Sequence, residues 1–258
     1  NIIAIFQHGN DIGSVAINRT GNRFLTGSIN GIVKLWELWD LDGKPNVRLI
    51  GTFNNGSPIL SVKFSPEDNK ILTVSWDGTA KLWNLNGEIL QTFHHDDWVK
   101  SVAANSEGDK ILTGSWDGTA KLWDLNEKIL QIFEHNNWVT SVAFNPQGDR
   151  ILTGSGDNTA KLWDLDGNLL VTFQHNASVT SVTFDPKGDK ILTGSWDNTA
   201  KLWDLNGKLI KTFNHNKGVI SASFSHKGDK FLTCSFNTCN IWALYNPTLA
   251  QLSLRKLI

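Results

Sequence analysis

Three sets of polar side chains in this sequence contain the residue types of a hydrolytic triad. His135, Thr153 and Asp157 follow one another with gaps of 18 and 4 residues. A hydroxyl, an imidazole and a carboxylate in contact could make the hydroxyl a nucleophile. A tryptophan follows each aspartate by 6 residues. The sets are His95, Thr113, Asp117 and Trp123; His135, Thr153, Asp157 and Trp163; and His175, Thr193, Asp197 and Trp203.

The recurrence of these sets argues against catalysis. A catalytic triad occurs once per active site, whereas the three sets recur in the same register along the chain. The same groups can form a structural chain, in which the carboxylate accepts from the imidazole, and the hydroxyl bonds both the imidazole and the indole N–H. Because buried polar groups must be paired, such a chain would stabilise each repeat. We therefore predict structural sets and no enzyme.

The tryptophans that end these sets reveal an internal repeat. Trp83, Trp123, Trp163 and Trp203 are each 40 residues apart. Trp36 lies 47 residues before Trp83, which we attribute to a loop lengthened by residues 39–45, and Trp242 lies 39 residues after Trp203. Six repeats thus cover almost the whole chain. We predict one domain over residues 1–244 and a C-terminal tail, 245–258, with the spacing of a short helix.

Each repeat contains four runs that are typical of β-strands. In the fourth repeat these runs are "WVTSVAFN", "RILTGS", "TAKLWD" and "NLLVTF", separated by the turn signals "PQGD", "GDN" and "LDG". Val, Ile, Thr, Phe and Trp dominate the runs and favour pleated sheets. Radially arranged units of four strands and about 40 residues predict an all-β propeller.

The 40-residue period, the "KLWD" endings and the histidine before each first strand resemble the WD40-repeat family. One departure is that the family's usual Gly-His pair reads Gln-His, His-His, Glu-His or Asn-His here. The resemblance implies a β-propeller of six four-stranded blades, in which the polar sets are the family's structural tetrads. Three tetrads are incomplete, with Asn30, Asn55 and Asn237 at tetrad positions. We expect those blades to be the looser ones.

The chain ends suggest how the ring closes. The sixth repeat has three strand-like runs, and "NIIAIFQHGN" aligns with "KLIKTFNHNK" of the fifth, so that Phe6 matches Phe213. We expect the N-terminal strand to supply the missing outer strand, as in the strand-exchange closure of WD40 rings, which removes an exposed sheet edge. Seven blades, the commoner number in the family, are the alternative.

The remaining tryptophans fall mostly at two fixed positions of the repeat. One position directly precedes the turn aspartate and the other comes three residues after the tetrad histidine. The resemblance places both positions, and the residue five after the histidine, on the top rim around the central channel. We expect a partner-binding face there, comprising Trp76, Trp98, Trp116, Trp138, Trp196, Phe236, Lys100 and Asp11.

The rim tryptophans favour a non-catalytic scaffold or sensor domain that binds a protein or peptide, because Trp is enriched at binding hot spots. The alternative from another class is a small ligand or carbohydrate bound at the central channel. A simpler interpretation is that recent duplication copied one tryptophan into several repeats. Gly156, which stands at the same position, indicates that the repeat does not require the tryptophan.

Composition excludes several classes of partner. The 24 Lys and Arg against 25 Asp and Glu leave no basic field for nucleic acid, and no apolar run approaches the about 20 residues that span a membrane. No cofactor or metal site is expected, since no cluster has ligand spacing.

Cys234 and Cys239 replace Gly194 and Ala200 of the preceding repeat, which predicts small packing residues and a cytoplasmic protein. Similarity to WD40 arrays of large bacterial sensor proteins suggests a larger multidomain chain.

Overall fold

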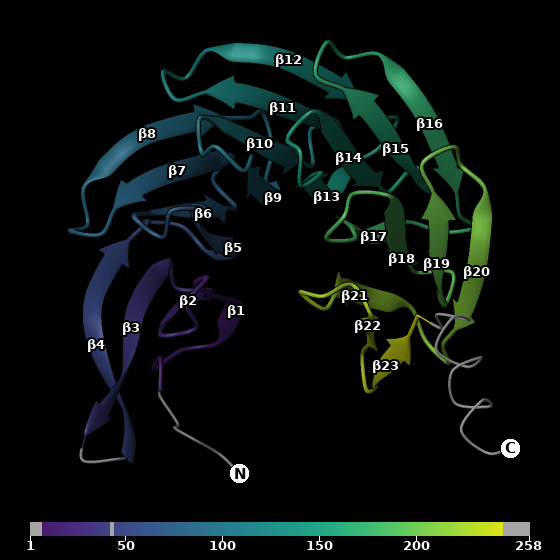
Figure 1. Ribbon diagram of the computed structural model, residues 1–258. Helices are drawn as coiled ribbons and strands as arrows, with labels where there is room; N and C mark the ends of the chain where they lie inside the picture. Colours follow the sequence, from purple (N-terminus) through teal and green to yellow (C-terminus); the bar gives the residue numbers. More distant parts are fainter. Residues whose placement is uncertain (1–6, 42–43, 245–258) are drawn as a thin grey trace, which may run out of the picture.

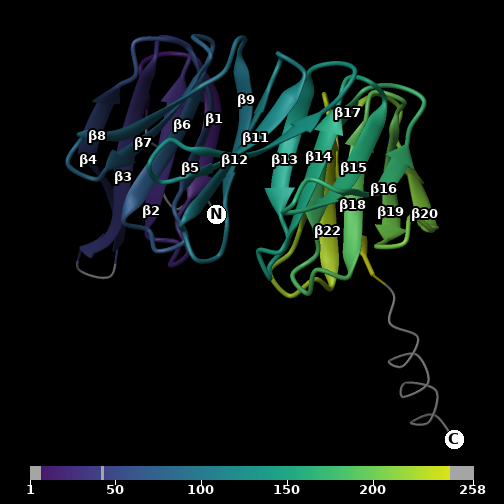
Figure 2. The same ribbon diagram turned by 90° about the horizontal axis from the view of Figure 1, so that it is seen from above.

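The computed structural model describes residues 7–41 and 44–244. Within those residues the chain forms 23 strands and no helix. The strands make six sheets that follow one another around a common axis (Figure 1). The strands of all six sheets run between the same two faces of the molecule (Figure 2). The all-β class and the six-bladed β-propeller predicted from the repeats are therefore confirmed.

The blades correspond to consecutive stretches of chain. The first two blades contain β1 (Ile12–Ile17), β2 (Arg23–Ser28), β3 (Ile32–Leu41) and β4 (Lys44–Asn54), then β5 (Ile59–Phe64), β6 (Lys70–Ser75), β7 (Thr79–Asn84) and β8 (Ile89–His94). The next two contain β9 (Val99–Ala104), β10 (Lys110–Ser115), β11 (Thr119–Asp124) and β12 (Ile129–Glu134), then β13 (Val139–Phe144), β14 (Arg150–Ser155), β15 (Thr159–Asp164) and β16 (Leu169–Gln174). The last two contain β17 (Val179–Phe184), β18 (Lys190–Ser195), β19 (Thr199–Asp204) and β20 (Leu209–Asn214), then β21 (Val219–Phe224), β22 (Lys230–Ser235) and β23 (Cys239–Ala243).

Strands in every blade pair with their neighbours in sequence, in antiparallel register. The first five blades have four strands, and the sixth has three among the described residues. The expected closure by the N-terminal strand involves residues 1–6, and the expected tail helix involves residues 245–258. Both lie outside the described residues and stay predictions.

The extra residues of the first repeat extend a hairpin. Strands β3 and β4 are longer than their counterparts in the other blades and pair from Ile32 with Asn54 to Leu41 with Lys44. The interpretation of residues 39–45 as a lengthened loop was therefore wrong for most of the segment. Residues 39–41, "WDL", alternate apolar and polar side chains, which suits continued pairing.

The apolar core lies between neighbouring blades. Leu152 and Leu162 of the fourth blade pack with Val179, Val182 and Trp203 of the fifth, and all five are at most 7% exposed. Equivalent clusters join the other consecutive blades from the first to the sixth. Because each buried Val or Leu contributes about 1.5–3 kcal/mol, a blade depends on its neighbours for most of its stability.

In the third to fifth blades, a glycine on the second strand allows the next blade to approach closely. A Cβ on Gly114 would lie 2.8 Å from the Cγ1 atoms of both Val139 and Val142 in the next blade. Gly154 and Gly194 are confined in the same way by the first strand of the blade that follows. The "TGS" of the repeat therefore has a packing origin.

The first and sixth blades expose apolar side chains at positions where the other blades bury theirs. Val15 on β1 is 68% exposed and Ile241 on β23 is 75% exposed, although their counterparts in other blades are buried. Figure 1 shows β1 and the β21–β23 sheet on opposite sides of an opening in the arc of blades. We call the surface between these two blades the seam.

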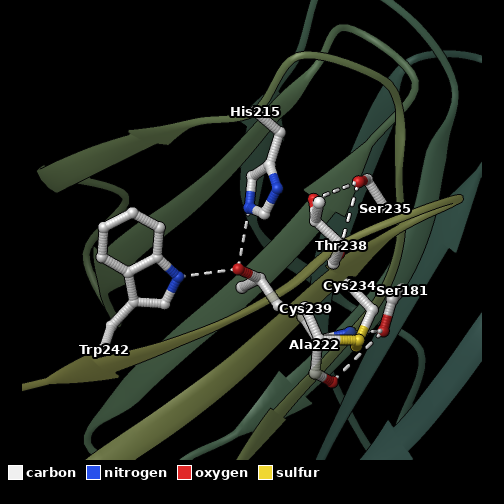
Figure 3. Close-up of a disulfide and its surroundings, with 9 residues drawn as sticks. Ser181, His215, Ala222, Cys234, Ser235, Thr238, Cys239 and Trp242 are labelled. Atoms are coloured by element: carbon white, nitrogen blue, oxygen red, sulfur yellow. Dashed lines mark hydrogen bonds between the residues drawn. A yellow bond between two sulfur atoms is a disulfide. The ribbon is translucent and has the colours of Figure 1, made fainter.

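The two cysteines form a disulfide on the sixth blade, which corrects the expectation of unpaired packing residues (Figure 3). Cys234 and Cys239 are directly opposite each other on β22 and β23, with Cα atoms 4.1 Å apart. Residues facing each other across an antiparallel pair bring their Cβ atoms close enough for a disulfide. The argument for a reducing compartment from unpaired cysteines therefore fails, and a cytoplasmic location stays a prediction.

Candidate functional site

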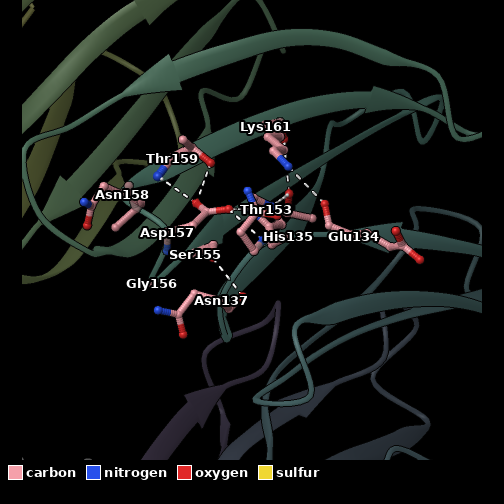
Figure 4. A network of polar contacts seen from close by, with 12 residues as sticks. Glu134, His135, Asn137, Thr153, Ser155, Gly156, Asp157, Asn158, Thr159 and Lys161 are labelled. Carbon is pink, nitrogen blue, oxygen red and sulfur yellow. Dashed lines mark hydrogen bonds and ion pairs between the residues drawn. The ribbon is translucent and has the colours of Figure 1, made fainter.

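The fourth blade contains one of the predicted tetrads (Figure 4). His135 Nδ1 lies 2.8 Å from Asp157 Oδ2, and His135 Nε2 lies 2.7 Å from Thr153 Oγ1. The indole N–H of Trp163 donates to the same hydroxyl oxygen at 2.9 Å. Since the carboxylate can only accept, the proton of the imidazole is on Nδ1, and Nε2 accepts the threonine O–H. The four groups thus form one continuous hydrogen-bonded chain.

The same geometry recurs in the third and fifth blades. The His–Asp and His–Thr distances are 2.7 and 2.7 Å for His95, and 2.8 and 2.7 Å for His175. Trp123 and Trp203 donate to their threonines at 2.8 and 2.9 Å. The structure therefore brings all twelve predicted tetrad residues into three tetrads.

The turn between the second and third strands places each tetrad aspartate. Asp157 Oδ1 accepts from the backbone N–H and the hydroxyl of Thr159, at 3.0 and 2.6 Å. Asn158 in between has a φ of 71°, a left-handed conformation that Asn and Gly tolerate. The "DN" and "DG" pairs of the repeat thus fix the carboxylate that the histidine needs.

Burial and hydrogen bonding set the charge states within the tetrads. Burial lowers the pKa of His135, and the nearby Asp157 only partly offsets this effect. Burial opposes ionisation of Asp157, but hydrogen bonds from His135 and Thr159 outweigh it and lower the pKa of that carboxyl. The histidine is therefore neutral and the aspartate ionised near pH 7.

The tetrads have no access for a substrate. Thr153 is 0% exposed, and the side chain of His135 is fully buried. A nucleophile must contact the atom that it attacks. The hydroxyls of these sets therefore have a structural role, as the recurrence of the motif indicated.

The second blade compensates for its missing histidine. Asn55 Oδ1 accepts from Thr73 Oγ1 at 3.0 Å, and Asn55 Nδ2 donates to Ser75 Oγ at 2.9 Å. Ser75 in turn donates to Asp77 at 2.6 Å. Ser75, which has a counterpart in every repeat, thus connects the Asn55 amide, which is shorter than a histidine side chain, to the carboxylate of Asp77. This connection was not foreseen from the sequence.

The first and sixth blades do not compensate for their missing aspartate. Asn30 and Asn237 replace the aspartate, and His8 Nε2 and His215 Nδ1 are buried without a hydrogen-bond partner in the described part of the chain. The turn of the sixth blade is also one residue shorter. A buried unpaired nitrogen costs about 1–3 kcal/mol. The expectation of looser blades is thus better supported for these two than for the second.

A lysine on the third strand fastens each tetrad to the preceding blade. Lys161 Nζ donates to the carbonyl of Glu134 at 3.0 Å and lies 5.4 Å from the ring centre of Trp163. Lys121 and Lys201 repeat both contacts. Lys161 therefore joins β15 to the end of β12 in the preceding blade through a charge-assisted hydrogen bond. Its cation–π contact with Trp163 holds the lysine over the indole of its own blade.

Four of the predicted rim tryptophans stack into a ladder. The ring centres of Trp76 and Trp98 are 4.6 Å apart with planes at 6°, and those of Trp98 and Trp116 are 4.6 Å apart at 29°. Trp138 continues the stack, 5.4 Å from Trp116 at 28°. We call these four residues the Trp ladder. It crosses from the second to the fourth blade.

Backbone hydrogen bonds set the spacing of the Trp ladder. The N–H of Trp116 donates to the carbonyl of Trp98 at 2.9 Å, which joins the two rim positions of one blade. The N–H of Gly156 donates to Trp138 in the same way. Contacts between blades then place Trp98 against Trp76, and Trp138 against Trp116. The ladder therefore alternates steps within a blade and steps between blades.

Two glycines mark where the rim tryptophans lie against the backbone. A Cβ on Gly156 would be 2.3 Å from Trp138 Nε1, and one on Gly218 would be 2.4 Å from Trp196 Cε3. Trp196 also contacts Phe236, with ring centres 5.2 Å apart. Gly156 is thus more than a position where tryptophan is dispensable, since it makes room for the end of the Trp ladder.

The remaining predicted rim residues do not join the Trp ladder. Trp196 and Phe236 form a separate pair, and Asp11 occupies the corresponding rim position of the first blade. Lys100 is exposed on β9, and the surrounding protein lowers its pKa by removing water. Trp39 lies on the long β3–β4 hairpin, where Arg48 stacks on it at 5.6 Å.

The ladder residues are accessible although they stack. Trp76 is 44% exposed, Trp116 38% and Trp138 40%, and Trp98 is partly buried between its two neighbours. Both faces of Trp98 and Trp116 are covered by other rings. The two inner rings therefore offer their edges to solvent rather than free ring faces.

The central channel is the other candidate binding space. It contains a cavity of about 540 Å³ lined by Lys63 and by the serines of the inner strands. Several of these serines accept backbone N–H groups of the next blade, as Ser141 does from Val182 at 3.1 Å. The channel serines thus serve packing, and Lys63 is the charged side chain at the cavity wall.

Among the described residues, no helix is long and apolar enough to cross a membrane. No group of three or more His, Cys, Asp or Glu residues in that part of the chain is arranged to hold a metal ion.

The six repeats match the repeat of a known family. The family described as "WD domain, G-beta repeat" matches this chain over residues 1–37, 47–84, 87–124, 127–164, 167–204 and 207–242. The six matched segments correspond to the six repeats inferred from the tryptophan spacing. No curated protein matches the chain.

Replacing Asp157 by Ala should destabilise the protein. The change leaves the buried His135 without its acceptor, which costs about 1–3 kcal/mol. Asn30→Ala is the matched control, because Asn30 occupies the same position but has no hydrogen bond to His8 in the first blade. Urea unfolding followed by circular dichroism measures both variants. Equal losses in the two variants would contradict the proposed importance of the His–Asp contact.

Acidification from pH 7 to 5 should lower the melting midpoint. Burial lowers the folded-state pKa of His95, His135 and His175 below the ordinary value of about 6.5, so below pH 6.5 the unfolded chain binds more protons than the folded one. Stability therefore decreases as pH falls through this window. His135→Asn, which copies the second blade, should show a shallower dependence. His226→Gln, outside the tetrads, is the control, and a parent-like slope for His135→Asn would refute this assignment.

Proposed function

Because the chain belongs to the WD40-repeat family, we propose that it binds a protein or peptide partner through the Trp ladder on its top rim. WD40 propellers generally mediate protein interactions and are typically non-enzymatic scaffolds. The observation that carries the proposal is the stack of four partly exposed indoles across three blades. Trp contributes more binding energy than most residue types when a partner buries it.

The geometry of the Trp ladder favours a protein over a carbohydrate. A sugar ring stacks on a free indole face, but the two inner rings, Trp98 and Trp116, have both faces covered. The exposed edges together form a continuous apolar strip. A strip of this kind suits apolar side chains of a partner, because binding would remove it from water without rearranging the rings.

The charged surroundings of the Trp ladder suggest a feature of the partner. Asp96 and Asp97 are exposed directly before Trp98, and Asp77 is exposed directly after Trp76. Lys100 is the nearby cation on the first strand of the third blade. We therefore infer a partner segment that combines apolar side chains with positive charge, since complementary charge raises the association rate.

A small ligand in the channel is the second candidate. Lys63 lines the cavity, and the surrounding protein lowers the pKa of its ammonium by removing water. An anionic group could pair with this lysine. The serines around it are engaged in hydrogen bonds between blades, which leaves few free polar groups to orient a ligand. The rim therefore remains the preferred site, and a cytoplasmic location and a larger parent chain accompany it as proposals.

Alanine at the four ladder positions should abolish partner capture. A variant carrying Trp76→Ala, Trp98→Ala, Trp116→Ala and Trp138→Ala is compared with the parent in a pull-down, and far-ultraviolet circular dichroism checks the fold. Each ladder tryptophan that is a hot spot should cost about 2 kcal/mol or more of binding free energy. Trp39→Ala, which changes an exposed tryptophan on the outer hairpin, is the matched control.

A second variant displaces the ladder without removing any tryptophan. Gly156→Ala adds a Cβ where Trp138 Nε1 would be 2.3 Å away, so the ring must move. Capture should weaken in this variant as well. Full retention of every partner by the folded quadruple variant would disprove the proposed site.

A further inference from the structure

The third blade has a small side chain where most other blades have a phenyl ring. The position is the last residue of the first strand, which is Ala104 in the third blade. The other blades have Ile17, at the seam, and then Phe64, Phe144, Phe184 and Phe224. Ala104 pairs with Ile111 across β9 and β10, just as Phe144 pairs with Ile151 across β13 and β14. The third blade therefore differs here in side chain and not in register.

The phenyl ring at this position packs between neighbouring blades. Phe144 packs against the apolar cluster that contains Leu122 of the preceding blade. Phe184 belongs to the equivalent cluster of the next interface and is 7% exposed. In the sixth blade, Phe224 contacts Phe231, with ring centres 5.8 Å apart. The ring thus completes the inter-blade contact at the end of the first strand.

A cavity of about 200 Å³ lies beside Ala104, between the second and third blades. Its apolar wall is formed by Leu82 of the second blade and by Ile111 and Leu125 of the third. Leu82 is the counterpart of Leu122, on whose cluster the ring of the next blade packs. The cavity therefore takes the place of the missing ring. Since an apolar cavity of about 150 Å³ can bind benzene, this one is large enough for a single phenyl group.

The residues around the cavity are mainly acidic. Glu67, Glu107 and Asp109, from the β5–β6 and β9–β10 turns, are exposed, and Lys70 is the cation among the lining residues. Asp109 is paired with Lys110 at 3.1 Å. Neither Glu67 nor Glu107 forms an ion pair within the described part of the chain. Two carboxylates beside the apolar wall are thus available to a cationic group.

We propose that this cavity, the phenyl pocket, binds the aromatic side chain of a partner segment in which basic residues flank the aromatic one. The phenyl ring lies against Leu82, Ile111 and Leu125, as the phenylalanine of another blade lies in its own interface. The flanking ammonium groups pair with Glu67 and Glu107. Burial of the ring supplies most of the affinity, and the charges select the flanking residues.

The phenyl pocket is separate from the Trp ladder. Strand β6 runs from Lys70, which lines the pocket, to Ser75, which directly precedes Trp76. The two sites therefore lie at opposite ends of the same strand, and on opposite faces of the ring of blades (Figure 2). A partner that occupies one site leaves the other free.

Filling the pocket from within tests whether it admits a ring. Ala104→Phe copies the fourth blade and should raise the melting midpoint by about 2 °C or more, because it buries apolar area in existing space. A lower midpoint would show that the space does not admit a phenyl group and would overturn the proposal. Ala103→Thr, which copies Thr183 of the fifth blade at the neighbouring position, is the matched control.

Binding is tested with a capped Gly-Lys-Phe-Lys-Gly peptide, titrated at millimolar concentration into the intact, nitrogen-15-labelled protein. Saturable amide shifts should appear at Gly108 and Ile111, beside the pocket, and not at Gly148 and Ile151, where Phe144 fills the equivalent place. Gly-Lys-Ala-Lys-Gly should bind about tenfold more weakly or less, since it lacks the ring. The Ala104→Phe protein should show no saturable shift, whereas Ala103→Thr should respond as the parent does.

The charges are tested separately. Glu67→Gln and Glu107→Gln should each weaken peptide binding by about twofold to fivefold, as expected for exposed ion pairs. Glu134→Gln, exposed at the end of β12, is the matched control. Absence of saturable shifts with the parent peptide would overturn the proposal, and so would equal shifts in Ala104→Phe. Equally tight binding of benzylamine would also overturn it, by assigning the pocket to a small aromatic amine.

The two proposed sites fail independently. The variant with alanine at the four ladder positions should bind the Gly-Lys-Phe-Lys-Gly peptide as well as the parent does, because none of those residues lines the phenyl pocket. Loss of peptide binding in that folded variant would place the peptide on the rim and overturn the assignment to the pocket.

Discussion

Contact between neighbouring blades is the physical constraint on which the rest of this structure depends. A single four-stranded sheet has two apolar faces and too little core to fold alone, so each blade must place its first strand against the leucines of the blade before it. A Cβ on Gly114 would lie 2.8 Å from the Cγ1 atoms of both Val139 and Val142. This contact fixes the distance between blades, and with it the positions of the tetrads, the channel and the rim.

The polar groups of the repeat are arranged around this packing. In the complete tetrads a buried threonine hydroxyl joins an indole to a neutral histidine, which donates to an ionised aspartate. The lysine above the indole adds a bond to the previous blade. Where a tetrad residue is missing, a nearby group can take over its hydrogen bond, as Ser75 does when Asn55 replaces the histidine. Where no such group is near, a buried nitrogen stays unpaired among the described residues, as at His8 and His215.

The rim has more freedom than the core because its side chains contact only one another and the backbone below. Tryptophan at Trp116 and glycine at Gly156 are both compatible with the turn between the second and third strands of a blade. The result is a stack of indoles over three blades and a separate Trp196–Phe236 pair. A surface that the fold does not require is where a binding function can vary without loss of stability.

Repetition made much of the molecule predictable from the sequence. The period of the tryptophans determined the number of repeats, the turn residues determined the strand boundaries, and the His, Thr, Asp and Trp spacing determined which groups bond in the tetrads. These features are local or recur in register, so one repeat explains the others. The rim positions as a partner-binding face stay a prediction, and which of them stack was not evident from the sequence.

Only the tertiary structure decided how the repeats meet. The sequence does not state that Trp98 and Trp116 lie with both faces covered, that Gly156 lies beneath Trp138, or that Cys234 and Cys239 face each other across one strand pair. Nor does it state which faces of the first and sixth blades remain exposed. The physical reason is that these contacts join residues of different strands or blades, whose distance depends on the angle between sheets and on the side chains packed between them.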